Sequence, residues 1–91
     1  MLTKDQMFAI YDFVNTNSGE RLWMRSEKLL DLTQELSHTD PQRIIINKFI
    51  SKNSNRIISE LETSIFSLFK KLIEAKDEQE VAFDLVPHME H

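Results

Sequence analysis

The chain has 91 residues, 41% hydrophobic and 29% charged, and this balance indicates one folded domain rather than a disordered chain. It contains no cysteine, which excludes disulfide frameworks, thiolate nucleophiles and cysteine zinc sites. One glycine and two prolines argue against a sheet with many tight turns, and a net charge of −4 argues against general affinity for nucleic acid.

A first helix is predicted from Thr3 to about Asn15. Thr3 and Gln6 have the spacing of a capping box, in which a hydroxyl and an amide side chain satisfy free backbone N–H groups. The apolar positions that follow repeat at helical spacing: Met7, Ile10, Tyr11 and Val14.

A second helix is predicted to begin between Ser18 and Glu20 and to stop at 37–40. Its apolar stripe recurs at every seventh residue, with smaller polar residues between: Leu22, Ser26, Leu29, Thr33 and Leu36. The stripe is apolar but modest.

Asp40 followed by Pro41 predicts the start of a third helix, because the carboxylate can cap free N–H groups and proline suits the first helical position. The apolar residues from Ile44 to Leu72 fit one long helix or two helices bent at 52–55, and we favour two. A buried strand at Ile44–Ile46 is the alternative, but the chain has no partner run of similar β-branched content. We expect the last helix to close near residues 75–77.

The predicted fold is therefore all-α: an antiparallel bundle of three to four helices over residues 1–76, possibly completed by dimerisation. Residues 77–91 should form an acidic C-terminal segment, either a short helix or a flexible tail, with the apolar group Val81–Val86 ended by Pro87.

No segment has the apolar length of a membrane span, which needs about 18 consecutive apolar residues. Asp5 and Asp12 interrupt the region where a secretory leader would need an apolar run. We therefore expect a cytoplasmic protein that does not enter a membrane.

The charge is unevenly distributed along the chain. Residues 39–57 carry +3, from four basic side chains and one acidic, whereas residues 77–91 carry −5, from five acidic side chains. These segments could pair within the chain, pair across a dimer, or leave the basic segment free for an acidic partner.

The sequence offers no convincing catalytic or metal site. Glu35 and His38 have the spacing of a helical metal motif, but no second such pair is present, and a solvated helix end is the simpler interpretation. Phosphate-binding loops and nucleophile–base pairs are also missing. We expect a protein that is not an enzyme and that uses no cofactor or metal.

The apolar surface exceeds what one core-facing stripe needs. Apolar side chains cover much of the circumference of the helix from about Ser54 to Lys76, and Leu22, Trp23 and Met24 spread around another helix. We expect self-association through the helix 54–76, with these residues at a partner or dimer interface: Trp23, Ile65, Phe66, Phe69 and Ile73.

The sequence therefore predicts a small interaction protein that binds and regulates or inhibits another protein, as small bacterial or phage regulators do. The alternative is a helix-turn-helix-like DNA-binding regulator, with Gln42 and Asn47 available for bases or phosphates. Four basic residues are the candidate contacts for nucleic acid or an acidic partner: Arg43, Lys48, Lys52 and Arg56.

Overall fold

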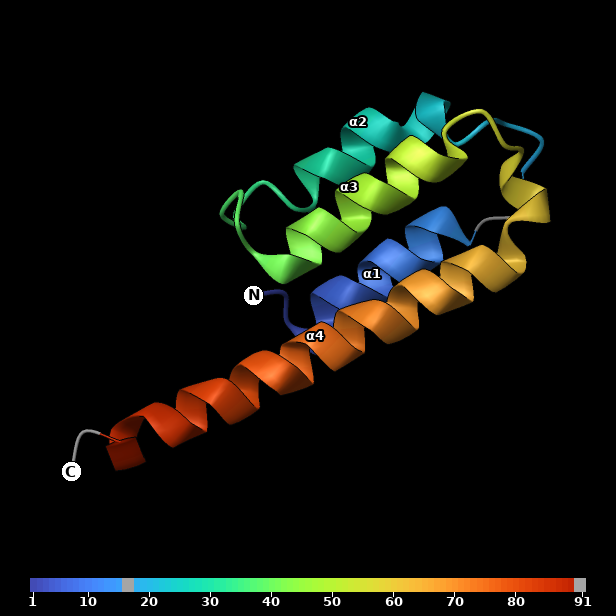
Figure 1. Cartoon of the computed structure of the whole chain (residues 1–91). Coiled ribbons are helices and arrows are strands. Elements are labelled where there is room, and N and C mark those ends of the chain that lie inside the picture. Colours follow the sequence, from blue (N-terminus) through green and yellow to red (C-terminus); the bar gives the residue numbers. More distant parts are fainter. Residues whose placement is uncertain (16–17, 90–91) are drawn as a thin grey trace.

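A computed structural model describes residues 1–15 and 18–89, and for residues 81–89 it describes the backbone alone. The fold is an all-α bundle of α1 (Lys4–Val14), α2 (Trp23–Asp31), α3 (Pro41–Asn53) and α4 (Glu62–Met89), with a 3₁₀ turn, η1, at Ile58–Glu60. Figure 1 shows α2 and α3 side by side, α1 and α4 side by side, and the end of α4 extending past the other helices. Each helix packs against two others, in the order α1, α2, α3, α4 and back to α1.

The two capped helix starts are confirmed. Thr3 accepts from the Gln6 N–H at 3.1 Å while the Gln6 side chain accepts from the Thr3 N–H at 2.8 Å, so both halves of the capping box form. Asp40 accepts from the Gln42 N–H at 2.9 Å, and Pro41 begins α3. The break between α3 and the last helix is also confirmed, because α3 ends at Asn53, but the last helix begins at Glu62 and not near Ser54 as expected.

The expected bounds of the second helix are wrong at both ends. Its predicted first residues pair with the α3–α4 connection instead: Leu22 donates to the Arg56 carbonyl at 2.9 Å, and Trp23 donates to the Ser54 carbonyl at 2.9 Å. After Asp31 the chain winds into tighter turns, with successive N–H groups bonded three residues back. The predicted stripe is nevertheless buried at Leu22, Leu29, Thr33 and Leu36.

The two interhelical connections hold the halves of the bundle together. An isolated antiparallel β-bridge joins Arg21 to Ile57. Beside it, Ile58 donates to the Glu20 carbonyl at 2.8 Å, and Ser59 donates to the Ser18 carbonyl at 3.0 Å. This pairing fixes the α1–α2 hairpin against the α3–α4 hairpin at one end of the bundle.

The core is built from one apolar stripe per helix, and α4 supplies the longest. Its buried residues alternate in steps of four and three, beginning at the residue before the helix: Leu61, Ile65, Leu68, Leu72 and Ala75. This spacing keeps them on one face of a helix. Met7, Ile10 and Val14 of α1 and Ile46 of α3 complete the centre of the core.

The last helix does not close near residues 75–77 as expected, but continues to Met89 with Pro87 inside it. Proline lacks the N–H that would bond four residues back, but Pro87 lies two residues before the end of α4, so it disturbs only the last turn. The described part of α4 that packs in the bundle ends near Lys76, whose ammonium donates to the Leu2 carbonyl at 3.2 Å. Among the described helices, none has the length and apolar character needed to cross a membrane.

Candidate functional site

An exposed aromatic face covers the contact between α1 and α4. The rings of Phe8 and Phe69 lie 5.1 Å apart, and those of Tyr11 and Phe69 lie 5.2 Å apart, in tilted arrangements that favour aromatic pairs. Phe66 lies one turn before Phe69 and is 60% exposed, and Phe8 is 53% exposed. We call Phe8, Tyr11, Phe66, Phe69 and Ile73 the aromatic face.

Local structure positions this face. The Thr3 capping box fixes the start of α1, and the bond from Lys76 to the Leu2 carbonyl ties that start to α4. Between these points, Ile10 and Ile65 pack in the core, while Tyr11, Phe69 and Ile73 pack partly buried against it. The aromatic face is therefore the outer rim of the α1–α4 packing, with the buried core beneath it.

The structure brings together only part of the predicted interface. Phe66, Phe69 and Ile73 share the aromatic face, but Ile65 is 1% exposed and belongs to the core. Trp23 is 56% exposed, yet it lies on α2, which packs against α1 and α3. Trp23 therefore lies on a different helix from every residue of the aromatic face, which belongs to α1 and α4.

Sequence reasoning did not place Phe8 and Tyr11 in the interface. In the sequence, Phe8 lies beside the helical stripe formed by Met7, Ile10 and Val14, which are buried in the structure. Its position off that stripe was the signal that Phe8 does not face the core. Only the packing of α1 along α4 shows that Phe8 and Tyr11 meet Phe69.

A second surface is a basic groove between α3 and the first half of α4, with a volume of about 480 Å³. Phe49 and Leu68 form its apolar floor, and Asn53 lies nine-tenths or more buried beside them. The remaining lining side chains are basic or hydroxyl-bearing, and none is acidic: Lys48, Lys52, Arg56, Lys71, Thr63, Ser64 and Ser67. We call this hollow the basic groove.

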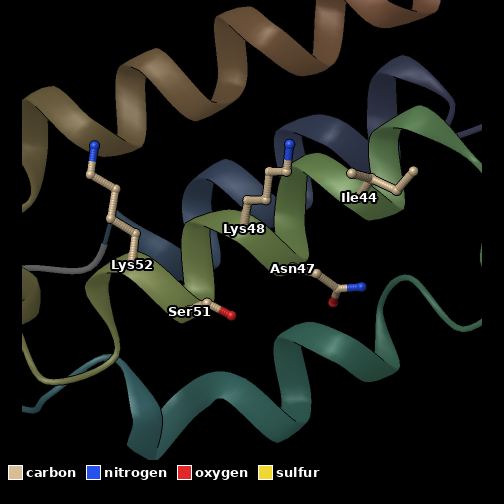
Figure 2. Close-up of a pocket in the computed structure, with 5 residues that line it drawn as sticks. All are labelled: Ile44, Asn47, Lys48, Ser51 and Lys52. Carbon is tan, nitrogen blue, oxygen red and sulfur yellow. The ribbon is translucent and has the colours of Figure 1, made fainter.

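Three of the four predicted basic residues line this groove, and Arg43 does not. The Arg43 guanidinium donates to the Leu36 carbonyl at 2.6 Å, near the α2–α3 connection. Figure 2 shows Lys48 and Lys52 extending from α3 toward α4, and Asn47 and Ser51 extending toward α2. Lys71 joins the set from α4, and nothing in the local sequence indicates that it would face Lys52.

The outer face of α3 has a broad, shallow hollow of about 640 Å³, lined by Ile44, Asn47, Lys48, Ser51 and Lys52. All its lining residues belong to one helix, so it is an exposed helix face. Gln42, which we expected to be available to nucleic acid, is fully buried. The helices α2 and α3 run side by side and are joined through residues 32–40, whereas helix-turn-helix motifs cross steeply after a turn of three or four residues.

The Glu35–His38 pair does not lie on one helix, because α2 ends at Asp31. Among the described residues, no group of three histidine, aspartate or glutamate side chains could hold a metal ion together. Comparison with models of protein families, with curated proteins and with solved structures gives no match.

Proposed function

We propose that this protein is a non-enzymatic interaction module that binds another protein through the aromatic face and regulates or inhibits that partner by covering its surface. The observation that supports this most strongly is the exposure of Phe66 and Phe8 beside a ring, Phe69, that is anchored on the core. Aromatic side chains held rigidly at the surface lose little conformational entropy on binding and are enriched at interface hot spots.

The partner that fits this face presents an apolar groove or an apolar helix face. The aromatic face is long and follows two helices, so a partner helix could lie along it. We place this activity in the cytoplasm, the compartment expected from the sequence.

Phe66→Asp tests the proposal, because Phe66 is 60% exposed and its replacement leaves the core packing intact. We expect this change to weaken partner binding by at least about 30-fold, the effect of losing about 2 kcal/mol at a hot spot. The measurement is photo-crosslinking in native cells from position 66, followed by mass spectrometry and a binding assay with the protein identified.

Trp23→Asp is the matched control, since Trp23 is a similarly exposed aromatic residue on another side of the bundle. It should retain binding, and both variants should retain the helical circular dichroism of the unaltered protein. Equal binding by both variants, or equal loss in both, would contradict a role for the aromatic face.

Binding of nucleic acid is the second candidate, and the basic groove is the observation that favours it. The whole chain is acidic, with a pI of about 5.3, which opposes binding to a polyanion. Retention of the unaltered protein on duplex DNA at low salt is the deciding measurement.

A further inference from the structure

The end of α4 projects from the bundle as a helix. Residues 77–89, which we call the tail, continue α4 past Lys76, whose ammonium donates to the Leu2 carbonyl, and span about 18 Å at 1.5 Å per residue. Within the sequence, Gln79, Ala82, Val86 and Met89 continue the steps of three and four that bury α4 in the bundle. A stripe with this spacing is typical of a helix that packs against another helix.

The tail is strongly acidic. It contains four acidic residues and no lysine or arginine. Asp77, Glu78 and Glu80 are exposed, and only Glu80 makes an ion pair, with Lys76 at 3.3 Å, among the described residues. Successive residues are about 100° apart around a helix, so Asp77, Glu78 and Glu80 spread over an arc of about 160° rather than forming one narrow stripe.

The basic groove has the opposite charge and lacks neutralising partners. Lys48, Lys52 and Lys71 make no ion pair with a described carboxylate. The groove follows α4 from Thr63 to Lys71, about 12 Å at helical rise, so a helix as long as the tail can cover it.

The tail cannot occupy the groove of its own chain. Both belong to α4, which is one continuous helix, and Asp84 lies about 20 Å along the axis from Lys71. A straight helix carries its tail away from its own groove, as Figure 1 shows.

We propose that a second copy of this chain supplies the occupant: two copies pair with their α4 helices antiparallel, and each tail lies in the other's basic groove. A two-fold axis crossing α4 near residue 74 places residues 77–85 of one copy beside residues 63–71 of the other, so that Asp77 lies opposite Lys71. The same contact then forms twice and closes the dimer, as in isologous interfaces. It leaves the aromatic face on another side of α4, free for the partner proposed above.

The tail combines acidic residues with apolar residues at helical spacing, Ala82, Val86 and Met89, which is why a second copy fits better than a polyanion. The phosphates of a nucleic acid would neutralise the lysines of the basic groove. They would be repelled, however, by the acidic tail and by the net charge of −4. A second copy covers the basic groove and the acidic tail of the first copy at the same time.

A charge exchange tests the dimer. Lys52→Glu with Lys71→Glu reverses the groove, and Asp77→Lys with Glu78→Lys reverses the tail; all four side chains are exposed, so both variants should fold. Each variant alone should raise the dimer dissociation constant at least about tenfold, because like charges then meet in both contacts. An equimolar mixture should restore association as a heterodimer, because each tail then meets a groove of opposite sign.

Sedimentation equilibrium measures these constants, and circular dichroism checks that each variant is folded. Lys4→Glu with Lys70→Glu is the control, because it makes the same charge change at exposed lysines outside the groove and should leave the dimer intact. Phe66→Asp should also leave the dimer intact, which separates this inference from the proposed binding face.

Three results would overturn the inference: an unaltered protein that stays monomeric at high concentration, a dimer that persists in both reversed variants, or a mixture that fails to associate. Retention of a monomeric unaltered protein on DNA, lost in the groove variant, would assign the groove to nucleic acid instead.

Discussion

Gln42 is a buried polar residue that connects three parts of the bundle. Its Oε1 accepts from the Leu2 N–H at 2.7 Å, and its Nε2 donates to the Leu72 carbonyl at 3.0 Å. A buried amide with both ends satisfied fixes its neighbours in one arrangement, since each lost partner would leave a buried polar group unpaired. Gln42 thereby sets how the N-terminal residues and α3 meet α4.

Gln42→Leu should lower the free energy of unfolding by about 1–3 kcal/mol, because it leaves the Leu2 N–H and the Leu72 carbonyl without this partner. Urea unfolding followed by circular dichroism measures the change. Gln34→Leu, at an exposed glutamine, should change stability by less than about 0.5 kcal/mol. Similar stability of the two variants would show that the Gln42 bonds contribute nothing.

Capping distinguishes the two helix starts that the sequence placed correctly from the start of α2, which it misplaced. α1 and α3 begin at side-chain caps, Thr3 and Asp40, whose geometry is local. α2 has no side-chain cap hydrogen bond at Leu22, and its start is set by backbone bonds to Ser54 and Arg56. Local signals therefore decided the starts of α1 and α3, and a long-range contact decided the start of α2.

Thr3→Ala should destabilise the protein by about 1 kcal/mol, since it removes the hydroxyl that accepts from the Gln6 N–H. Thr3→Ser keeps an accepting hydroxyl and should stay close to the unaltered protein. Thermal unfolding at one protein concentration compares the three. A Thr3→Ala protein as stable as Thr3→Ser would mean that the capping box does not stabilise α1.

At the scale of the whole molecule, stability depends on one shared core rather than on separate helices. Ile65, Leu68 and Leu72 of α4 share this core with buried residues of all three other helices. The paired connections at Arg21 and Ile57 hold one end of the bundle, and the contact of Lys76 with Leu2 holds the other. The bundle should therefore unfold as one cooperative unit.

Leu72→Ala should lower the free energy of unfolding by about 2–5 kcal/mol, because Leu72 is fully buried and its truncation leaves a cavity. That is a large share of the roughly 5–15 kcal/mol that holds a small domain together. Urea titration should show a lower midpoint and an unchanged slope. Ile44→Ala, at a residue 40% exposed, is the control and should cost much less; equal losses would place Leu72 outside the core.

The amino-acid sequence by itself determined the helical class, two capped helix starts, the bend after α3 and most of the buried stripes. These features follow from interactions within a few residues: a hydroxyl or carboxylate beside free N–H groups, or apolar residues at helical spacing. The sequence also identified Phe66 as a candidate interface residue, and Lys48 and Lys52 as candidate basic contacts.

Only the tertiary structure decided that Ile65 is internal, that Phe8 and Tyr11 meet Phe69, that Lys71 shares a groove with Lys52, and that Gln42 is buried. Each depends on which helix lies beside which, and helical spacing is the same whether a face meets a neighbour or solvent. The length of α4 was misjudged because polar composition after Ala75 signals the end of burial, and a helix can continue beyond the core that it packs against.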